Sequence, residues 1–250
     1  MCPECHPPPP LVDPLTPEQW ELSKQEAAIF QIPVELVAGT VAVEIVHDTQ
    51  WHDPVLDFML ALGLQYHYVG QSGWVPRHRQ HMQWCEVATG LLAGYEHYWG
   101  RLGGRGPGPG VTNFHIGTAK MVEEYFAQEY ADWRVLDAPP DAYMRMGLLL
   151  SDPVSIHYAA AYLRHLADLR KGTGIQPLKR PHTHDLTDLD MQVIAGAFRA
   201  GVGKGKGYRT VKHFQEATTP GVEYGPLIRP FLSFYRRKLA LEYGRLLRYM

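Results

Sequence analysis

The sequence predicts a mainly α-helical fold. Apolar residues recur with the period of a helix in several segments, most regularly between residues 34 and 45. Helix start and stop signals flank these segments, with Thr, Asp or Pro before them and Gly after them. No segment alternates apolar and polar residues in the manner of a half-buried strand, and the sequence contains no internal repeat.

The first predicted helix covers residues 17–30. Thr16 is placed to cap it, Pro17 suits its first turn, and Gln19 stands three residues after the cap, as in a capping box. Residues 1–15 contain four consecutive prolines, and we expect them to form a flexible leader.

The second predicted helix has the clearest periodicity in the chain. It begins after Pro33, and its apolar residues follow the spacing i, i+3, i+4, i+7, i+8 and i+11: Val34, Val37, Ala38, Val41, Ala42 and Ile45. These positions form one apolar stripe, with Glu44 at one margin and Glu35 near the opposite margin. We expect a carboxylate at the margin of such a stripe to be half withdrawn from water.

The segment that follows this helix has the weakest pattern in the chain. Helices are expected at 57–64 and 83–99, and a loop rich in glycine and proline at 103–110. The aromatic and histidine residues between the two expected helices have the chemistry to stack on sugars or to fill a core.

Four further helices are predicted in the rest of the chain. One covers 121–131, a second starts at Asp152 as N-cap and ends at Gly172, a third starts with a capping box at Thr187–Asp190 and ends before Gly201, and the last runs from Pro230 to about Leu247. The basic residues on or next to the last helix are Arg236, Arg237, Lys238, Arg245 and Arg248.

The composition excludes several classes of protein. With 45% hydrophobic and 20% charged residues among 250, the chain has enough apolar side chains to build a core, so wholesale disorder is excluded. No apolar run approaches the ~20 residues that cross a bilayer, so we expect no membrane span. Three cysteines do not make a disulfide framework.

The signals for metal or phosphate are weak, and we expect no cofactor. Cys2 and Cys5 have the spacing of a zinc ligand pair, but no second pair completes the site. His182 and His184 lie beside a proline and are typical of a solvated loop. The glycine-rich run 201–207 follows a helix without a preceding strand, which disfavours a phosphate-binding loop.

Charge is divided unequally along the chain. Residues 1–169 hold 9 Lys and Arg against 20 Asp and Glu, a balance of −11, whereas residues 170–250 hold 15 against 6, a balance of +9. The basic part has the charge to attract a polyanion such as nucleic acid or anionic cell wall. The alternative is that the two parts neutralise each other in the fold.

Four segments of the chain share features with one known family. They are the helix 34–45 with Glu44 near its end, the stretch Ile116-Gly117-Thr118-Ala119-Lys120-Met121, the segment Leu149–Leu163 with Asp152-Pro153 and Ala161-Tyr162-Leu163, and the segment Ala195–Gly201. In this order they resemble the lysozyme superfamily, above all its goose-type lysozyme and lytic transglycosylase branch. The corresponding family features are the catalytic acid, a Gly-x-x-Gln turn, a helix after Asp-Pro that carries Ala-x-Tyr-Leu, and an Ala-Tyr-Asn-x-Gly segment that lines the sugar cleft.

The resemblance implies one lysozyme-like helical domain over residues 16–250, with an insertion at about 60–112. It implies a peptidoglycan glycosidase, either a muramidase or a lytic transglycosylase, that cleaves the β-1,4 bond between N-acetylmuramic acid and N-acetylglucosamine. Glu44 is then the catalytic acid. The residues implied to bind the glycan strand, and expected to face the same cleft as Glu44, are Gly117, Lys120, Tyr162, Phe198 and Arg199.

The chain departs from the family pattern at four positions. Ile45 stands where the family often has Ser, and Lys120 where it has Gln. Phe198 replaces a Tyr and Arg199 an Asn, which removes a hydroxyl and an amide expected to orient the substrate or the acid. The alternative to an active enzyme is therefore a degenerate lysozyme fold that only binds glycan or a partner protein.

A second catalytic carboxylate is less clearly indicated. Inverting glycosidases need a base that activates water across the sugar. Asp48 lies one turn after Glu44 on the same face and is the candidate, with Asp53 and Asp57 further along. Lytic transglycosylases need no second carboxylate, because groups of the substrate itself take part. The sequence leaves both outcomes open.

The first residues have neither the basic start nor the apolar stretch of a secretory signal. A wall-directed enzyme is therefore expected to act in the periplasm or outside the cell after non-classical export, delivery by a dedicated machine, or lysis. It would be an antibacterial toxin domain or a lysin, and a toxin is expected to have an inhibitor or immunity protein as a partner. The expected ligand is the peptidoglycan glycan strand, and no nucleic acid is expected.

Overall fold

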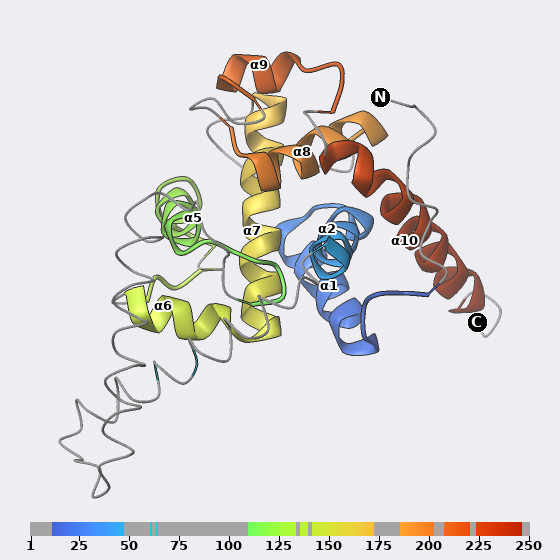
Figure 1. The fold of residues 1–250 in the computed structure, drawn as a ribbon, viewed down its shortest axis with the longest axis horizontal. Helices are drawn as coiled ribbons and strands as arrows, with labels where there is room; N and C mark the ends of the chain where they lie inside the picture. Colours follow the sequence, from blue (N-terminus) through green and yellow to red (C-terminus); the bar gives the residue numbers. More distant parts are fainter. Residues whose placement is uncertain are drawn as a thin grey trace, which may run out of the picture.

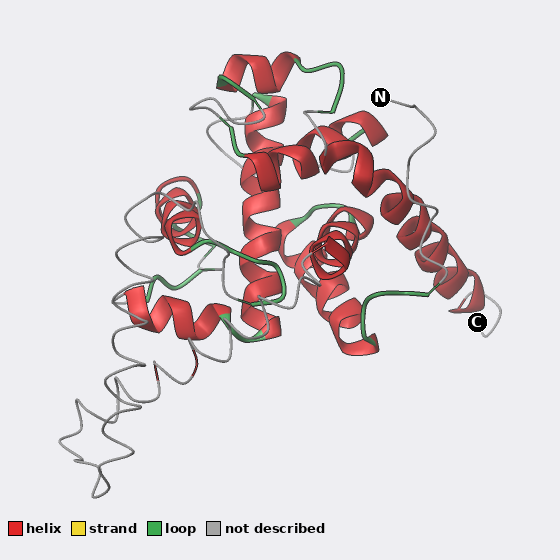
Figure 2. Ribbon diagram, in the orientation of Figure 1, coloured by secondary structure: helices red, strands yellow, loops and turns green. Residues whose placement is uncertain are grey.

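The mainly α-helical prediction is confirmed by the computed structural model. Within the part of the chain that it describes, every regular element is a helix, with one isolated parallel bridge between Val202 and Tyr208 (Figure 2). The described residues are 12–47, 61, 64, 110–133, 136–139, 142–172, 186–202, 208–220 and 224–246.

The described helices follow one another in the order shown in Figure 1. They are α1 (Pro17–Phe30), α2 (Val34–His47), α5 (Ile116–Glu129), α6 (Ala142–Leu149), α7 (Asp152–Lys171), α8 (Asp188–Ala200), α9 (Val211–Glu216) and α10 (Tyr224–Leu246). The helices expected at 57–64 and 83–99, the loop at 103–109 and the insertion at about 60–112 lie outside the described residues, apart from single positions.

Helix α2 occupies the centre of the fold. It packs against α1, α7, α8 and α10, and Figure 1 shows it enclosed between α7 and α10. Val37 and Val41 of the predicted stripe are fully buried, but so are Leu36 and Val43 on other sides of the helix. The helix is therefore buried around nearly its whole circumference, as a helix that is apolar on all sides must be. Glu44, expected to be half withdrawn from water, is only 3% exposed.

Helices α2 and α10 pack closely at Gly39. A Cβ there would lie 3.4 Å from Leu232 Cδ2 and 3.6 Å from Ile228 Cγ1, both on α10, which is ordinary van der Waals contact. The apolar residues that α10 contributes to the shared core are Ile228, Phe231, Leu232 and Tyr235.

Helix α7 connects the two sides of the molecule. In Figure 1 it runs between the pair α5 and α6 on one side and α1 and α2 on the other. Its small buried residues, including Ala159, Ala160 and Ala161, allow neighbours to pack closely on several sides. Gly172 caps its end in a left-handed conformation, as predicted, but its N-cap is Ser151 and not Asp152. Asp152 instead lies in the first turn and accepts a 2.8 Å hydrogen bond from Gln19 Nε2.

Both predicted capping boxes are confirmed. The Thr16 side chain accepts from the Gln19 backbone while the Gln19 side chain accepts from the Thr16 backbone, and Thr187 and Asp190 make the same reciprocal pair. These bonds satisfy N–H groups that a helix start otherwise leaves without partners.

Two helices start earlier than predicted, and two were not expected. Helix α5 begins at Ile116, five residues before the predicted start, because its N-cap makes no side-chain hydrogen bond that the sequence could signal. Helix α10 begins at Tyr224 and holds Pro230 in its interior, where the missing N–H leaves one helical hydrogen bond unformed. Helix α9, capped by Thr210, is too short to show a periodic pattern and was not expected. The eight-residue helix α6 was not expected either.

Residues 12–15, which the sequence assigned to the leader, pack against α10. Leu15 is buried, and Asp13 accepts hydrogen bonds from Tyr235 (2.6 Å) and Lys238 (2.5 Å). None of the helices that the structure describes has the length and apolar content needed to cross a membrane.

The turn before α5 packs through a glycine against the end of α6 and the start of α7. Gly110 has a φ of +79°, and a Cβ built there would lie 1.9 Å from the Leu149 carbonyl oxygen. Next to it, the buried Thr112 and Ser155 hydroxyls are 2.6 Å apart. No residue with a side chain fits at position 110 unless the backbone shifts.

We predict that Gly110→Ala destabilises the fold by more than 2 kcal/mol, because strain at positive φ adds to a backbone clash (each roughly 1–3 kcal/mol). The matched control is Gly172→Ala. Gly172 has a φ of +66°, but no atom lies closer than 3.8 Å to a Cβ added there. It should cost only about 1 kcal/mol. Urea unfolding of both variants measures the difference, and equal losses would contradict the close contact at Gly110.

Candidate functional site

Glu44 lies where the central helix leaves the core. Its side chain is 3% exposed, Ile45 is half-buried, and Val46 is already 40% exposed. The Glu44 side chain is thus withdrawn from water one residue before the chain becomes half-buried and two before it reaches solvent. The second carboxylate candidate, Asp48, lies outside the described residues.

Three aromatic rings from different segments meet beside α7. Tyr162 of α7 lies 5.6 Å from Phe198 of α8 between ring centroids, and Phe114 lies 5.9 Å from Tyr162 and 6.0 Å from Phe198. We call these residues the aromatic triad. The structure therefore brings together two of the sequence-predicted site residues, Tyr162 and Phe198.

Phe114 is the member of the triad that sequence reasoning missed. It stands two residues before the stretch that starts at Ile116, and this proximity to a family-like segment was the available signal.

Burial raises the pKa of Tyr162 to about 12, so its hydroxyl stays neutral at any physiological pH. Tyr162 also stacks on His165, with ring centroids 6.2 Å apart.

The polar candidates lie at the surface. Gly117 is exposed in the first turn of α5, with open space where a Cβ would stand. Lys120 has 65% of its side chain exposed and lies 3.9 Å from Glu124 one turn later. Arg199 is exposed near the end of α8. In Figure 1, α7 lies between α5 and α2, so Lys120 is on the other side of α7 from the helix that carries Glu44.

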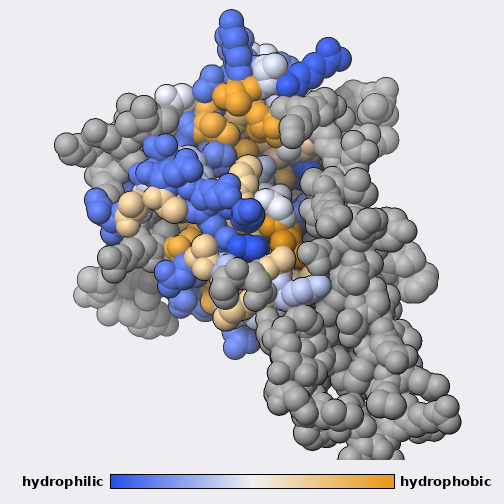
Figure 3. Space-filling model, turned by 90° about the vertical axis from the view of Figure 1, so that its left-hand side faces the viewer, coloured by the Kyte–Doolittle hydropathy of each residue, from blue (hydrophilic) through white to orange (hydrophobic). Residues whose placement is uncertain are grey.

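The stretch Ile116–Met121 forms the beginning of α5 instead of the turn that the family pattern implied. Figure 3 views the molecule from the side where α5 and α6 lie, and hydrophilic side chains cover much of the described surface there. Small apolar patches interrupt it, and the exposed apolar residues of these two helices are Met121, Met144 and Leu148.

A buried ionic network that the sequence did not predict fixes α5 to α7. Asp168 accepts a 2.9 Å hydrogen bond from the Tyr125 hydroxyl and a further one from Tyr130, and its carboxylate lies 3.1 Å from Arg164 Nε. Arg164 also donates to the Phe30 carbonyl at the end of α1 (3.1 Å). Burial first, and then the neighbouring Asp168 carboxylate, raise the pKa of Tyr125 and Tyr130.

A second network fixes α6 to the same pair of helices. Arg145 makes a bidentate pair with Glu123, with N–O distances of 2.7 and 2.6 Å, and the Tyr158 hydroxyl donates to Glu123 at 2.7 Å. Each carboxylate of the two networks is paired on several sides, which is what makes a charge tolerable in a protein interior. The side chains of these two networks fix α5, α6 and α7 relative to one another.

Among the described residues, no group of three or more His, Cys, Asp and Glu side chains is placed to hold a metal ion. Cys2, Cys5, His182 and His184 lie outside the described residues. No family model, no curated protein and no solved structure matches this chain.

Asp190 holds α8, and with it Phe198, in position against α7. Its carboxylate lies 2.9 Å from Arg170 Nε and 2.7 Å from Lys171 Nζ, and it also accepts from Thr187. Burial alone would raise the pKa of Asp190, but the hydrogen bonds from Lys171, Arg170 and Thr187 outweigh it and lower the pKa to about 2. Arg170 donates further to carbonyl groups at the end of α9.

This lowered pKa predicts an acid-sensitive contribution to stability. Because the unfolded value is 3.8 and the folded value about 2, the ionised form contributes about 2 kcal/mol above pH 4, and this is lost as the pH falls through 2. Asp190→Asn should lose that stability at pH 7 and show a smaller decline between pH 4 and pH 2. Urea midpoints at several pH values measure both effects.

The control for Asp190 is Asp188→Asn on the same helix. Asp188 has 66% of its side chain exposed and pairs with Arg236 at the surface, so its removal should cost little. If both variants lose the same stability at pH 7, the buried carboxylate has no special role at this junction.

Proposed function

We propose that this chain is a peptidoglycan glycosidase with Glu44 as its general acid. The observation that carries the proposal is the position of Glu44, withdrawn from water in the last turn of the central apolar helix and two residues from solvent. The proposed reaction cleaves the β-1,4 bond between N-acetylmuramic acid and N-acetylglucosamine. The order of the four family-like segments supports the same assignment.

Cleavage of a glycosidic bond needs a proton at the leaving oxygen. A general acid must carry that proton when the bond breaks, and a carboxyl group is able to supply it. In the proposed reaction Glu44 donates this proton as the bond to the leaving sugar breaks. The packed neighbours of the helix keep the carboxyl group in place, so little reorganisation is needed.

The aromatic triad is the proposed support for the sugar. Phe198 is only half-buried, and its ring rests on Phe114 and Tyr162, so a flat apolar face is held rigidly. Arg199, exposed near the end of α8, is proposed to bind a polar group of the glycan strand further out.

We predict that Glu44→Gln reduces solubilisation of purified peptidoglycan by about 10²–10⁴-fold, because the amide keeps the shape and has no proton to donate. Glu35→Gln is the matched control on the same helix, where Arg236 lies 3.2 Å from the Glu35 carboxylate and 15% of the Glu35 side chain is exposed. It should retain activity. Turbidity of sacculus suspensions measures both, and an unchanged rate in Glu44→Gln would refute the assignment.

The masses of the products distinguish hydrolysis from the intramolecular transfer of a lytic transglycosylase. Hydrolysis adds one water to the released reducing end, whereas intramolecular transfer releases a product one water lighter. Mass spectrometry of the soluble fragments reads this directly. If hydrolysis is found, Asp48→Asn tests whether that carboxylate activates the water.

The second candidate function is a degenerate lysozyme-like fold that binds glycan or a partner protein without cleaving. The observation that favours it is Phe198, which presents a ring without the hydroxyl that the family uses near the acid. This reading predicts that the wild type and Glu44→Gln bind sacculi equally and that neither releases fragments.

Phe198→Tyr restores the missing hydroxyl. We predict that it raises the rate of peptidoglycan cleavage several-fold, because a hydrogen bond from the added hydroxyl to the sugar or the acid would be stronger in the transition state than in the ground state. Phe198→Leu serves as the control, since it removes the ring and adds no polar group. If Phe198→Tyr cleaves peptidoglycan no faster than the wild type, the missing hydroxyl at position 198 does not limit the activity.

The proposed substrate places the activity in the periplasm or outside the cell. An antibacterial toxin domain or a lysin fits this substrate. For a toxin, an inhibitor that covers Glu44 is the proposed partner in the producing cell.

A further inference from the structure

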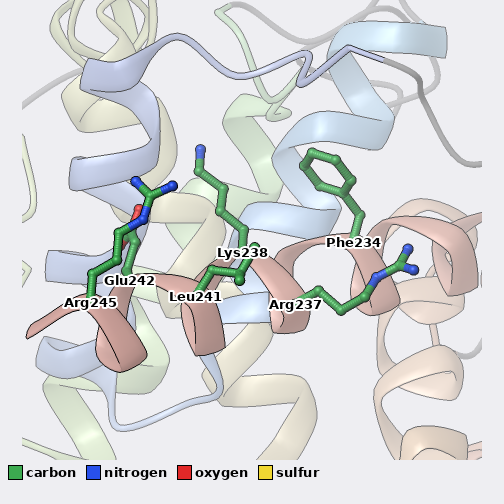
Figure 4. Close-up of a pocket in the computed structure, with 6 residues that line it drawn as sticks. All are labelled: Phe234, Arg237, Lys238, Leu241, Glu242 and Arg245. Atoms are coloured by element: carbon green, nitrogen blue, oxygen red, sulfur yellow. The ribbon is translucent and has the colours of Figure 1, made fainter. Parts of the chain in front are cut away.

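The C-terminal half of α10 presents two arginines and a leucine to solvent. Arg237, Leu241 and Arg245 are spaced by four residues, so they lie along one side of the helix, and Figure 4 shows Leu241 between the two arginines. Leu241 is 65% exposed. Eight residues of helix separate the arginines by about 12 Å along the axis. We call these three residues the arginine stripe.

The other charges of this part of the molecule are bound within the fold. Arg236 pairs with Glu35 of α2 at 3.2 Å and with Asp188 at 2.6 Å, and Lys238 pairs with Asp13 at 2.5 Å. Part of the basic C-terminal region is thus neutralised by acidic groups, as the alternative interpretation of the charge division held.

Glu242 is likewise engaged. It accepts a 2.7 Å hydrogen bond from Trp20 Nε1 and pairs with Lys24 at 3.2 Å, both on α1. Of the described carboxylates, none pairs with Arg237 or Arg245. Arg237 uses only its Nε, which donates to the Ser233 carbonyl of its own helix at 3.2 Å. Both guanidinium groups therefore retain N–H donors directed to the outside.

Hollows border this half of α10 on two sides. One of about 460 Å³ is lined by the stripe together with Phe234, Lys238 and Glu242 (Figure 4). Another of about 470 Å³ lies toward α1 and is lined by Ala27, Ile32 and Tyr243 among others. The helix stands between them as a ridge that a flexible chain is able to follow.

We propose that the arginine stripe binds a phosphate-bearing polymer of the cell wall and so holds the enzyme on its substrate. The proposal deepens the proposed function and depends on it for the ligand, because an enzyme that cleaves peptidoglycan works beside the polymers attached to the wall. A guanidinium group binds phosphate through two parallel N–H···O bonds, and a polymer with repeated phosphates is able to engage both arginines at once. Leu241 and the apolar wall of the hollow provide contact for the uncharged part of each repeat.

The apolar residues of α10 argue against a membrane as the partner. A helix that lies in a lipid surface needs a continuous apolar face on its outer side. Of the large apolar α10 residues whose burial the structure describes, only Leu241 and Tyr243 are strongly exposed.

The test compares two variants of equal charge change in the Glu44→Gln background, so that binding is measured without turnover. The first is Arg237→Glu with Arg245→Glu. The control is Arg209→Glu with Lys212→Glu, two exposed cations at α9. The probes are purified sacculi with their phosphate polymer attached and the same sacculi after acid extraction of that polymer.

The stripe variant should bind polymer-bearing sacculi about tenfold or more weakly than the parent, and the control should bind like the parent. Added salt should weaken the binding of the parent to polymer-bearing sacculi and have little effect on the binding of the stripe variant. On extracted sacculi all proteins should bind alike. Equal binding of the stripe variant and the parent to polymer-bearing sacculi overturns the proposal, as does stripe-dependent binding to phosphatidylglycerol vesicles or duplex DNA at the level seen with sacculi.

A failure of the catalytic proposal gives a different pattern. With Glu44 restored, the stripe variant should cleave a short soluble glycan as fast as the wild type, because the stripe does not touch the reacting bond. Loss of binding with this turnover intact supports the docking role. Absence of turnover in every protein, together with stripe-dependent binding, overturns the enzyme and leaves the docking surface.

Discussion

The burial of α2 on all sides is the constraint on which the rest of this structure depends. A helix without a solvent face needs neighbours on every side, and here α1, α7, α8 and α10 supply them. The free energy of removing its apolar side chains from water, about 25 cal/mol per Å², is available only when all four are in place. The position of Glu44 follows from the same arrangement, since a carboxyl group at the end of such a helix is withdrawn from water by the walls that surround the helix.

Much of the helical framework follows from local signals in the sequence. Thr16 with Gln19, and Thr187 with Asp190, set the starts of α1 and α8, because a capping box satisfies N–H groups within four residues of chain. Where a start has no local signal, as at Ile116, the prediction was late by several residues. The start of α10 was also misplaced, because Pro230 is tolerated inside a helix that long-range packing stabilises.

The site was less predictable than the framework, and the reason is distance along the chain. Periodicity identified one apolar stripe on α2, but the burial of its other side depends on α10, almost 200 residues later. The resemblance to lysozymes selected Tyr162 and Phe198, which do meet, and missed Phe114, which completes their cluster. The pairing of Asp168 with Tyr125 and Tyr130, and of Glu123 with Arg145, cannot be recognised from spacing, because the partners come from separate helices.

The contacts between the first and last described helices have a consequence for how the chain acquires its structure. Trp20 and Lys24 of α1 bind Glu242 of α10, and α10 also covers α2 at Gly39. Since a ribosome makes α1 and α2 first and α10 after all the other described helices, α2 remains without one of its walls until α10 has been made. Nascent chains should therefore hold an exposed apolar helix until that point, and this is the stage at which chaperones bind and aggregation begins.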